Sequence, residues 1–156
     1  MNASSVIDQV AQSAIYWEDL PVGTRYATSS RTITEADVAA FAALTGDFNR
    51  VHVDAEYAKG TIFGQRIAHG LYTASLISAV LGTRLPGAGA VYRSQTLNFH
   101  APVKIGDVVT VIVEVIELVP KGRQVRLHCE ALVDNGLVLD GEAIVSVPAR
   151  PKEAVA

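Results

Sequence analysis

Apolar and polar residues alternate through much of the second half of the chain, in segments rich in valine, leucine and isoleucine. Alternation of this kind predicts β-strands with one buried face. The expected strands cover residues 91–99, 107–119, 123–133 and 137–147. Turn residues at Lys121–Gly122 and Asn135–Gly136 separate the last three. The second half therefore predicts a meander of long antiparallel strands.

The first half has helical spacing in two places. Thr34 can cap a first helix that carries acidic residues in its first turn and ends at Gly46. Its apolar stripe consists of Val38, Phe41, Ala42 and Leu44. A second helix is expected from His69 to about Leu81, with Gly82 as its stop. Because this second helix is apolar or small on every side, we expect burial nearly all round, inside a sheet that wraps it.

A chain of 156 residues with 49% apolar residues and 19% charged residues predicts one globular domain. We place this domain at residues 15–149. Residues 1–14 are expected to form an arm, helical or flexible, and residues 150–156 a tail. A short polar strand over Thr24–Ile33 precedes the first helix, and a loop over Gly60–Ile67 precedes the second. The fold class is α+β.

Charge and cysteine content narrow the possible partners. The formal net charge is -3, and no run of lysine or arginine occurs, which argues against nucleic acid and anionic membrane. The apolar stretch 71–81 is interrupted by hydroxyl residues and is shorter than the ~20 residues of a membrane span. The N-terminus lacks the pattern of a signal peptide, so a cytoplasmic protein is expected. Cys129 is the only cysteine and is expected to be a buried, inert thiol.

Acid, amide and imidazole groups are concentrated in residues 45–54, shortly before Ala68-His69-Gly70. Taken alone, Asp47 is typical of a turn, and His52 of a surface or core histidine. Their occurrence together ahead of a buried helix favours an acid/base site. Asp54 is better placed to cap a short turn of helix than to act in catalysis. His52, Asp54 and His69 could also be metal ligands, but their spacing matches no zinc motif, so no metal is expected.

These segments resemble the MaoC-like dehydratases and (R)-specific enoyl-CoA hydratases. That family has an aspartate and a histidine five residues apart, followed by His-Gly at the head of the central helix. The matching segments are Gly46-Asp47-Phe48-Asn49, His52-Val53-Asp54, His69-Gly70 and Ala101-Pro102-Val103-Lys104-Ile105-Gly106-Asp107. The likeness covers residues 17–147. The chain departs from the family at Arg50, where proline is usual and would stiffen the loop.

The resemblance implies a hot-dog fold, in which an antiparallel sheet wraps around a central helix. It also implies reversible syn hydration of a trans-2-enoyl-CoA to an (R)-3-hydroxyacyl-CoA. The enzyme would act as a homodimer and need no cofactor, with coenzyme A present only as part of the substrate. Two alternatives stay open. A hot-dog thioesterase would direct water at the thioester carbonyl, and a non-catalytic module would only bind acyl-CoA.

Site residues follow from the same resemblance. Asp47 is expected to activate water and His52 to protonate C2, although the two roles could be reversed. The Gly70 backbone N–H, at the positive end of the helix, would hold the enolate oxygen. Supporting roles are expected for Asn49, for Ser78 as a hydrogen-bond partner of Asp47, and for His69 at the helix head. The sequence provides no specific residue for binding the coenzyme A phosphates.

Overall fold

The computed structural model describes residues 15–28 and 30–152, so the predicted arm at 1–14 lies outside the described residues. The helices are η1 (Trp17–Asp19), α2 (Glu35–Thr45), α3 (Arg50–Val53), α4 (Ala55–Lys59) and α5 (Gly70–Thr83). The strands are β1 (Arg25–Ala27), β2 (Arg31–Thr32), β3 (Val91–Gln95), β4 (Asn98–Phe99), β5 (Val108–Val119), β6 (Gln124–Val133) and β7 (Gly136–Ser146).

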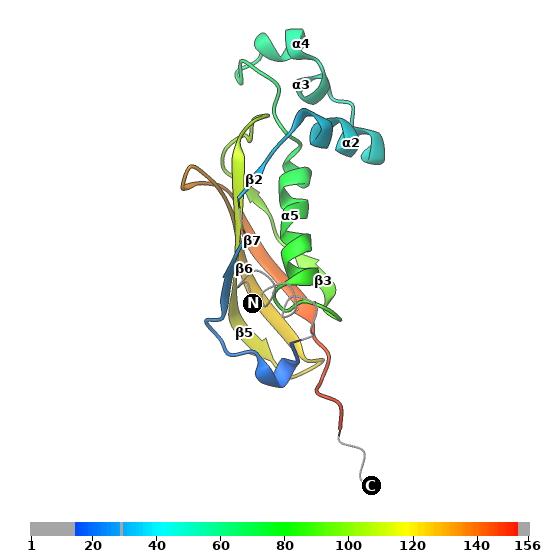
Figure 1. Ribbon diagram of the computed structural model, residues 1–156, viewed down its shortest axis with the longest axis vertical. Helices are drawn as coiled ribbons and strands as arrows, with labels where there is room; N and C mark the ends of the chain where they lie inside the picture. Colours follow the sequence, from blue (N-terminus) through cyan, green and yellow to red (C-terminus); the bar gives the residue numbers. More distant parts are fainter. Residues whose placement is uncertain (1–14, 29, 153–156) are drawn as a thin grey trace, which may run out of the picture.

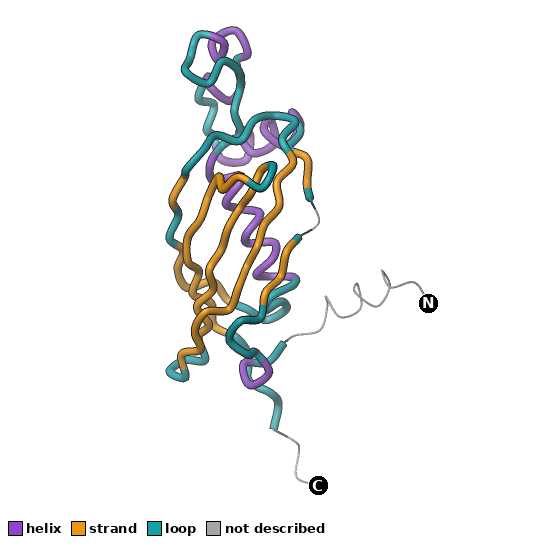
Figure 2. Tube along the Cα trace, turned by 90° about the vertical axis from the view of Figure 1, so that its left-hand side faces the viewer, coloured by secondary structure: helices purple, strands orange, loops and turns teal. Residues whose placement is uncertain are grey.

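The strands form one antiparallel sheet in the order β1-β5-β6-β7-β3, with β2 paired to β5 and β4 paired to β7. Buried and half-buried positions alternate along β5, β6 and β7, as the sequence pattern predicts. The buried side chains of these strands belong to the same core as Ile77 and Leu81 of α5. Helix α5 therefore lies along the inner face of the curved sheet, and burial of this shared core holds the two together (Figures 1 and 2).

Two predicted strands are interrupted. The segment 24–33 forms the short strands β1 and β2, and the segment 91–99 forms β3 and β4. The β6–β7 turn also differs in detail from the predicted Asn-Gly turn. Asp134 and Asn135 adopt φ angles of 49° and 64°, and Gly136 already pairs with Val133. Both residues tolerate positive φ because their short polar side chains can bond to the local backbone, so the turn lies one residue earlier.

Helix α2 begins as predicted. The Thr34 side chain accepts a hydrogen bond from Asp37 N, and the Asp37 carboxylate accepts one from Thr34 N. These bonds satisfy amides that have no partner inside the helix, and they lower the pKa of Asp37. The predicted apolar stripe is wrong at Leu44, which is 85% exposed. The last turn of α2 extends beyond the part of the core that covers Val38 and Ala42.

Helix α5 differs from the prediction at its end and in its burial. It extends to Thr83 with Arg84 as its C-cap, so Gly82 is an internal residue and not the stop. Burial all round is also wrong, because Leu71 is 61% exposed and Ser78 lies on the same exposed face. A sheet that curves around one side of a helix can cover only the stripe that faces it. Within one chain, the opposite stripe of α5 stays open.

The short helices α2, α3 and α4 gather at the end of the molecule where α5 begins (Figure 1). The residues of the predicted site lie on this end. None of the helices in the described parts of the chain is long and apolar enough to cross a membrane. Cys129 is buried in β6, as predicted, and burial raises the pKa of its thiol to about 12, which disfavours the reactive thiolate.

Candidate active site

Asp47 occupies a tight polar loop directly after α2. Gly46 ends that helix in the left-handed conformation, with φ of 78°, which glycine adopts without strain. The Asp47 amide donates to the Thr45 hydroxyl at 3.2 Å, and the Asn49 amide donates to Asp47 Oδ1 at 3.2 Å. The carboxylate is therefore held by its own loop while the residue remains exposed. Such a group can both bind water and accept a proton.

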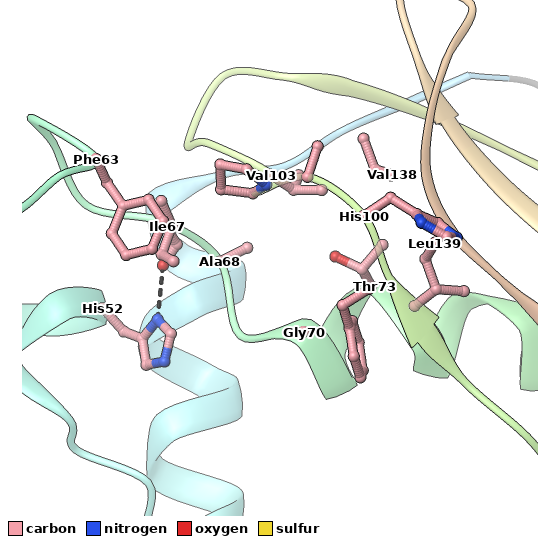
Figure 3. A pocket seen from close by; sticks show the side chains of 13 residues that line it. His52, Phe63, Ile67, Ala68, Gly70, Thr73, His100, Val103, Val138 and Leu139 are labelled. Carbon is pink, nitrogen blue, oxygen red and sulfur yellow. Dashed lines mark hydrogen bonds between the residues drawn. The ribbon is translucent and has the colours of Figure 1, made fainter.

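His52 lies on α3 and is only 8% exposed. Asn49 caps this single turn, because its side-chain oxygen accepts a hydrogen bond from Val51 N at 3.3 Å. His52 Nδ1 lies 2.8 Å from the carbonyl oxygen of Ile67 (Figure 3). A carbonyl only accepts, so Nδ1 carries the proton and Nε2 is left for other partners. The backbone carbonyl of a distant segment thus determines which nitrogen of His52 can act in catalysis.

His69 joins the two halves of the site. It is 2% exposed at the N-cap of α5, and its Nε2 donates to the backbone oxygen of Asp47 at 2.9 Å. Its ring also stacks on that of His52, with centroids 3.9 Å apart and planes at 28°. His69 therefore holds the Asp47 loop and the His52 turn against the head of α5. This contact gives a structural basis for the supporting role predicted for His69.

A metal ion could be held by Asp47, His52 and His69. One ligand atom from each lies within 4.8 Å of the other two, and this is the one such group of acidic, histidine or cysteine side chains among the described residues. Asp54, considered earlier as a ligand, is not part of it. Asp54 instead caps α4, because Oδ1 accepts a hydrogen bond from Tyr57 N at 2.9 Å. The predicted capping role is confirmed, and this bond lowers the pKa of Asp54.

Gly70 is the first residue of α5, where a backbone N–H has no partner inside the helix. The Phe99 ring lies against it so closely that a Cβ at this position would be 2.7 Å from Phe99 Cε1. Glycine therefore permits the close approach of the ring. A free amide at the positive end of the helix dipole is suited to a developing oxyanion, which is the role expected of Gly70.

Two cavities of about 340 Å³ each meet at this point and share His52, Gly70 and Phe99. The first also includes Asp47 and His69. The second is mostly apolar and is closed by Val138 and Leu139 from β7 (Figure 3). A thioester at Gly70 would thus have polar groups on one side and an apolar hollow on the other. The geometry brings the three predicted catalytic positions together around a shared space.

Sequence reasoning missed several residues that line the apolar cavity. Phe99, Thr73 and His100 are absent from the site residues predicted above. His100 does pair with Asp140 at 3.1 Å, but it also lines the cavity. Thr73 offered a weak signal, because it is a hydroxyl residue on the buried stripe of an apolar helix. Phe99 offered none, since its position over Gly70 depends on the β4–β7 pairing.

The supporting residues have mixed outcomes. Asn49 acts as the α3 cap and as a donor to Asp47. Ser78 is exposed about two turns along α5 from Gly70, and none of the hydrogen bonds found within the described chain joins it to Asp47. A direct contact between these side chains is therefore not made inside one chain.

Comparison of the chain with known proteins identifies its family. Residues 19–133 match the MaoC like domain. The chain belongs to the MaoC-like family. It is 59% identical over 134 residues to the 3-hydroxybutyryl-CoA dehydratase of Methylorubrum extorquens, covering 86% of this chain and 85% of that protein. It is 50% identical to the (R)-specific enoyl-CoA hydratase of Rhodospirillum rubrum, covering 86% and 93% of the two chains.

A solved MaoC-like relative confirms the fold. The (R)-hydratase from A. caviae involved in PHA biosynthesis superposes with a TM-score of 0.81 at 41% identity, covering 84% of this chain and 99% of the other. The predicted α+β hot-dog architecture is therefore correct.

Proposed function

We propose that this MaoC-like protein catalyses the reversible syn hydration of a trans-2-enoyl-CoA to an (R)-3-hydroxyacyl-CoA. The observation that carries the proposal is the convergence of Asp47, His52 and Gly70 around one cavity, beside a mostly apolar second cavity. Hydration needs a base, an acid and an oxyanion donor, and the site supplies one of each. The names of the relatives at 59% and 50% identity agree with this chemistry.

The proposed reaction assigns one proton transfer to each side chain. The Asp47 carboxylate takes a proton from water while the water oxygen bonds to C3 of the enoyl group. The electron pair of the C2–C3 double bond moves toward C2 and the thioester oxygen, which accepts a hydrogen bond from Gly70 N–H. His52 acts as an imidazolium: its Nδ1–H stays on the Ile67 carbonyl at 2.8 Å, and its Nε2 gives a proton to C2, which leaves a neutral ring. The proton that Asp47 took from water then returns to Nε2, so that both groups are ready for the next turnover. Dehydration follows the same steps in reverse.

A crotonyl-CoA assay tests the proposal against hydrolysis of the thioester. We expect the enoyl absorbance to fall with no release of free thiol, and chiral analysis to give the (R)-3-hydroxy product. The rate should be the same with and without EDTA, because both proton transfers use protein side chains. Thiol release would instead support a thioesterase. Tight binding of crotonyl-CoA with neither reaction would support a module that only binds acyl-CoA.

We further propose that two copies associate through the open stripe of α5 and the free edge of β3. The stripe contains Leu71, Ser75, Ser78, Ala79 and Gly82, which are all exposed in one chain. Strand β3 ends the described sheet order and exposes 52% of Val91. An uncovered strand edge and a helix stripe of small residues with an exposed leucine form a surface that proteins usually bury. Association would also cover the cavity beside Asp47, which Leu71 lines.

Replacing Leu71 by aspartate should convert the dimer to a monomer. A charge placed on a buried apolar interface must lose its water without gaining a partner. Light scattering coupled to gel filtration measures the mass, with 16.6 kDa expected for one chain. Ile62→Asp is the matched control, because Ile62 is 96% exposed and lies outside the α5 stripe. A monomeric wild-type protein, or a Leu71→Asp dimer as tight as wild type, would contradict the proposed interface.

A further inference from the structure

The turn that carries His52 is too short to hold itself in place. Helix α3 has four residues, and isolated helical turns are unstable because one hydrogen bond cannot offset the entropy of ordering them. Catalysis requires His52 to keep a fixed position, since misplacement by about 1 Å can cost 10²-fold in rate. The contacts that fix this turn are therefore part of how the site works.

Arg50, the first residue of α3, reaches across the turn to its end. Its Nε and Nη2 donate to Asp54 Oδ2 at 3.1 Å and 2.8 Å. Its guanidinium also lies over the Tyr57 ring, 4.5 Å from the centroid. Asp54 ends α3 and begins α4, with its other oxygen on Tyr57 N at 2.9 Å. These three side chains, the Arg50 clamp, join both ends of the turn to the next helix.

From this geometry we propose that Arg50 is a positioning residue that holds His52 in its catalytic place. This inference rests on the proposed function, because it assigns Arg50 a role in the same proton transfer. We infer that Arg50 acts through the turn, because Nε and Nη2 of its guanidinium donate to Asp54 and its face lies over Tyr57. The pair is exposed, so added salt should weaken it.

The backbone allows a separate way to stiffen the same turn. Arg50 is at the first helical position, where proline is favoured because its missing N–H has no helical partner. Asn49, the preceding residue, has ψ of 127°, outside the α region that a following proline disfavours. Arg50→Pro should therefore restore by covalent restraint what Arg50→Ala removes. This pair of variants separates stiffness of the turn from charge at position 50.

Steady-state hydration of crotonyl-CoA by full-length wild type, R50A, R50P and K59A tests the inference. We expect R50A to lower kcat about tenfold with little change in KM, and R50P to return kcat to within about threefold of wild type. K59A is the control, because Lys59 forms an exposed ion pair with Glu56 on α4 outside the clamp. Raising KCl to about 1 M should lower kcat of wild type more than that of R50P.

The outcomes separate failure of the inference from failure of the proposed function. If wild type does not hydrate enoyl-CoA, the proposed function fails and the inference fails with it. If wild type is active, three results overturn the inference alone: an unchanged kcat in R50A, a kcat in R50P as low as in R50A, or a rise confined to KM. The last result would mean that Arg50 contacts the coenzyme A portion of the substrate directly.

Discussion

Asp47→Asn lowers kcat for crotonyl-CoA hydration by about 10²- to 10⁴-fold in our expectation, which is the usual share of a general acid or base. Asparagine has the same shape and can still accept the hydrogen bond that Asn49 N donates to Oδ1. It cannot take a proton from water. The loss should therefore appear in kcat, with the fold and the melting temperature nearly unchanged.

The measurement needs a control for the same chemical change elsewhere. Asp134→Asn serves, because Asp134 is exposed in the β6–β7 turn and asparagine also tolerates its φ of 49°. Stopped-flow or steady-state loss of enoyl absorbance gives kcat, and circular dichroism gives the melting temperature. If Asp47→Asn kept more than about a tenth of wild-type kcat, the carboxylate would not be the base.

A double variant tests whether Asp47 and His52 act as a unit. His52→Ala alone should cost about as much as Asp47→Asn, because either change leaves one proton transfer without a carrier. If the two groups serve one transition state, the double variant should be only a few-fold slower than the worse single variant. Multiplicative losses would instead indicate two separate contributions.

The sequence predicted the elements whose pattern is local. The periodicity of β5, β6 and β7 and the cap at Thr34 are visible in a few neighbouring residues, and the structure contains them. The errors at Gly82 and Leu44 have another origin. Gly82 can continue α5 because glycine only weakens a helix, and Leu44 is exposed because the core does not extend below it. Both depend on packing partners far along the chain.

The site shows the same division. The Asp47, His52 and Gly70 motif can be read from residue types and spacing, and the geometry places all three around one cavity. The bond from His52 to the Ile67 carbonyl could not be predicted, since every residue has a carbonyl. The Arg50 clamp could not be predicted either. The sequence showed only a departure from the family's usual proline, and the structure shows the contacts that the arginine makes instead.

Gly141→Ala should destabilise the protein by ~3 kcal/mol or more, the largest stability effect that we expect from a single methyl group. Gly141 lies in β7, opposite the short segment that joins β3 to β4. A Cβ there would be 1.8 Å from the carbonyl oxygen of Thr96 and 2.7 Å from its carbonyl carbon. These are backbone atoms, and two hydrogen bonds of 2.9 Å hold Thr96 against Glu142 of β7. Thr96 N donates to the Glu142 carbonyl oxygen, and Glu142 N donates to the Thr96 hydroxyl. The strands must therefore separate to make room.

Guanidinium unfolding followed by circular dichroism measures this loss, with Gly60→Ala as the control. Gly60 has φ of -80°, and its added Cβ would meet only Tyr57 O at an ordinary 3.5 Å, so a change within about 0.5 kcal/mol is expected. If the free energy of unfolding of the Gly141→Ala protein were within about 1 kcal/mol of the wild-type value, the prediction would be wrong. The segment between β3 and β4 could then move away from β7 at little cost. Because Leu139 of β7 pairs with Phe99 of β4 and both line the apolar cavity, separation of these strands should also lower the activity of the folded fraction.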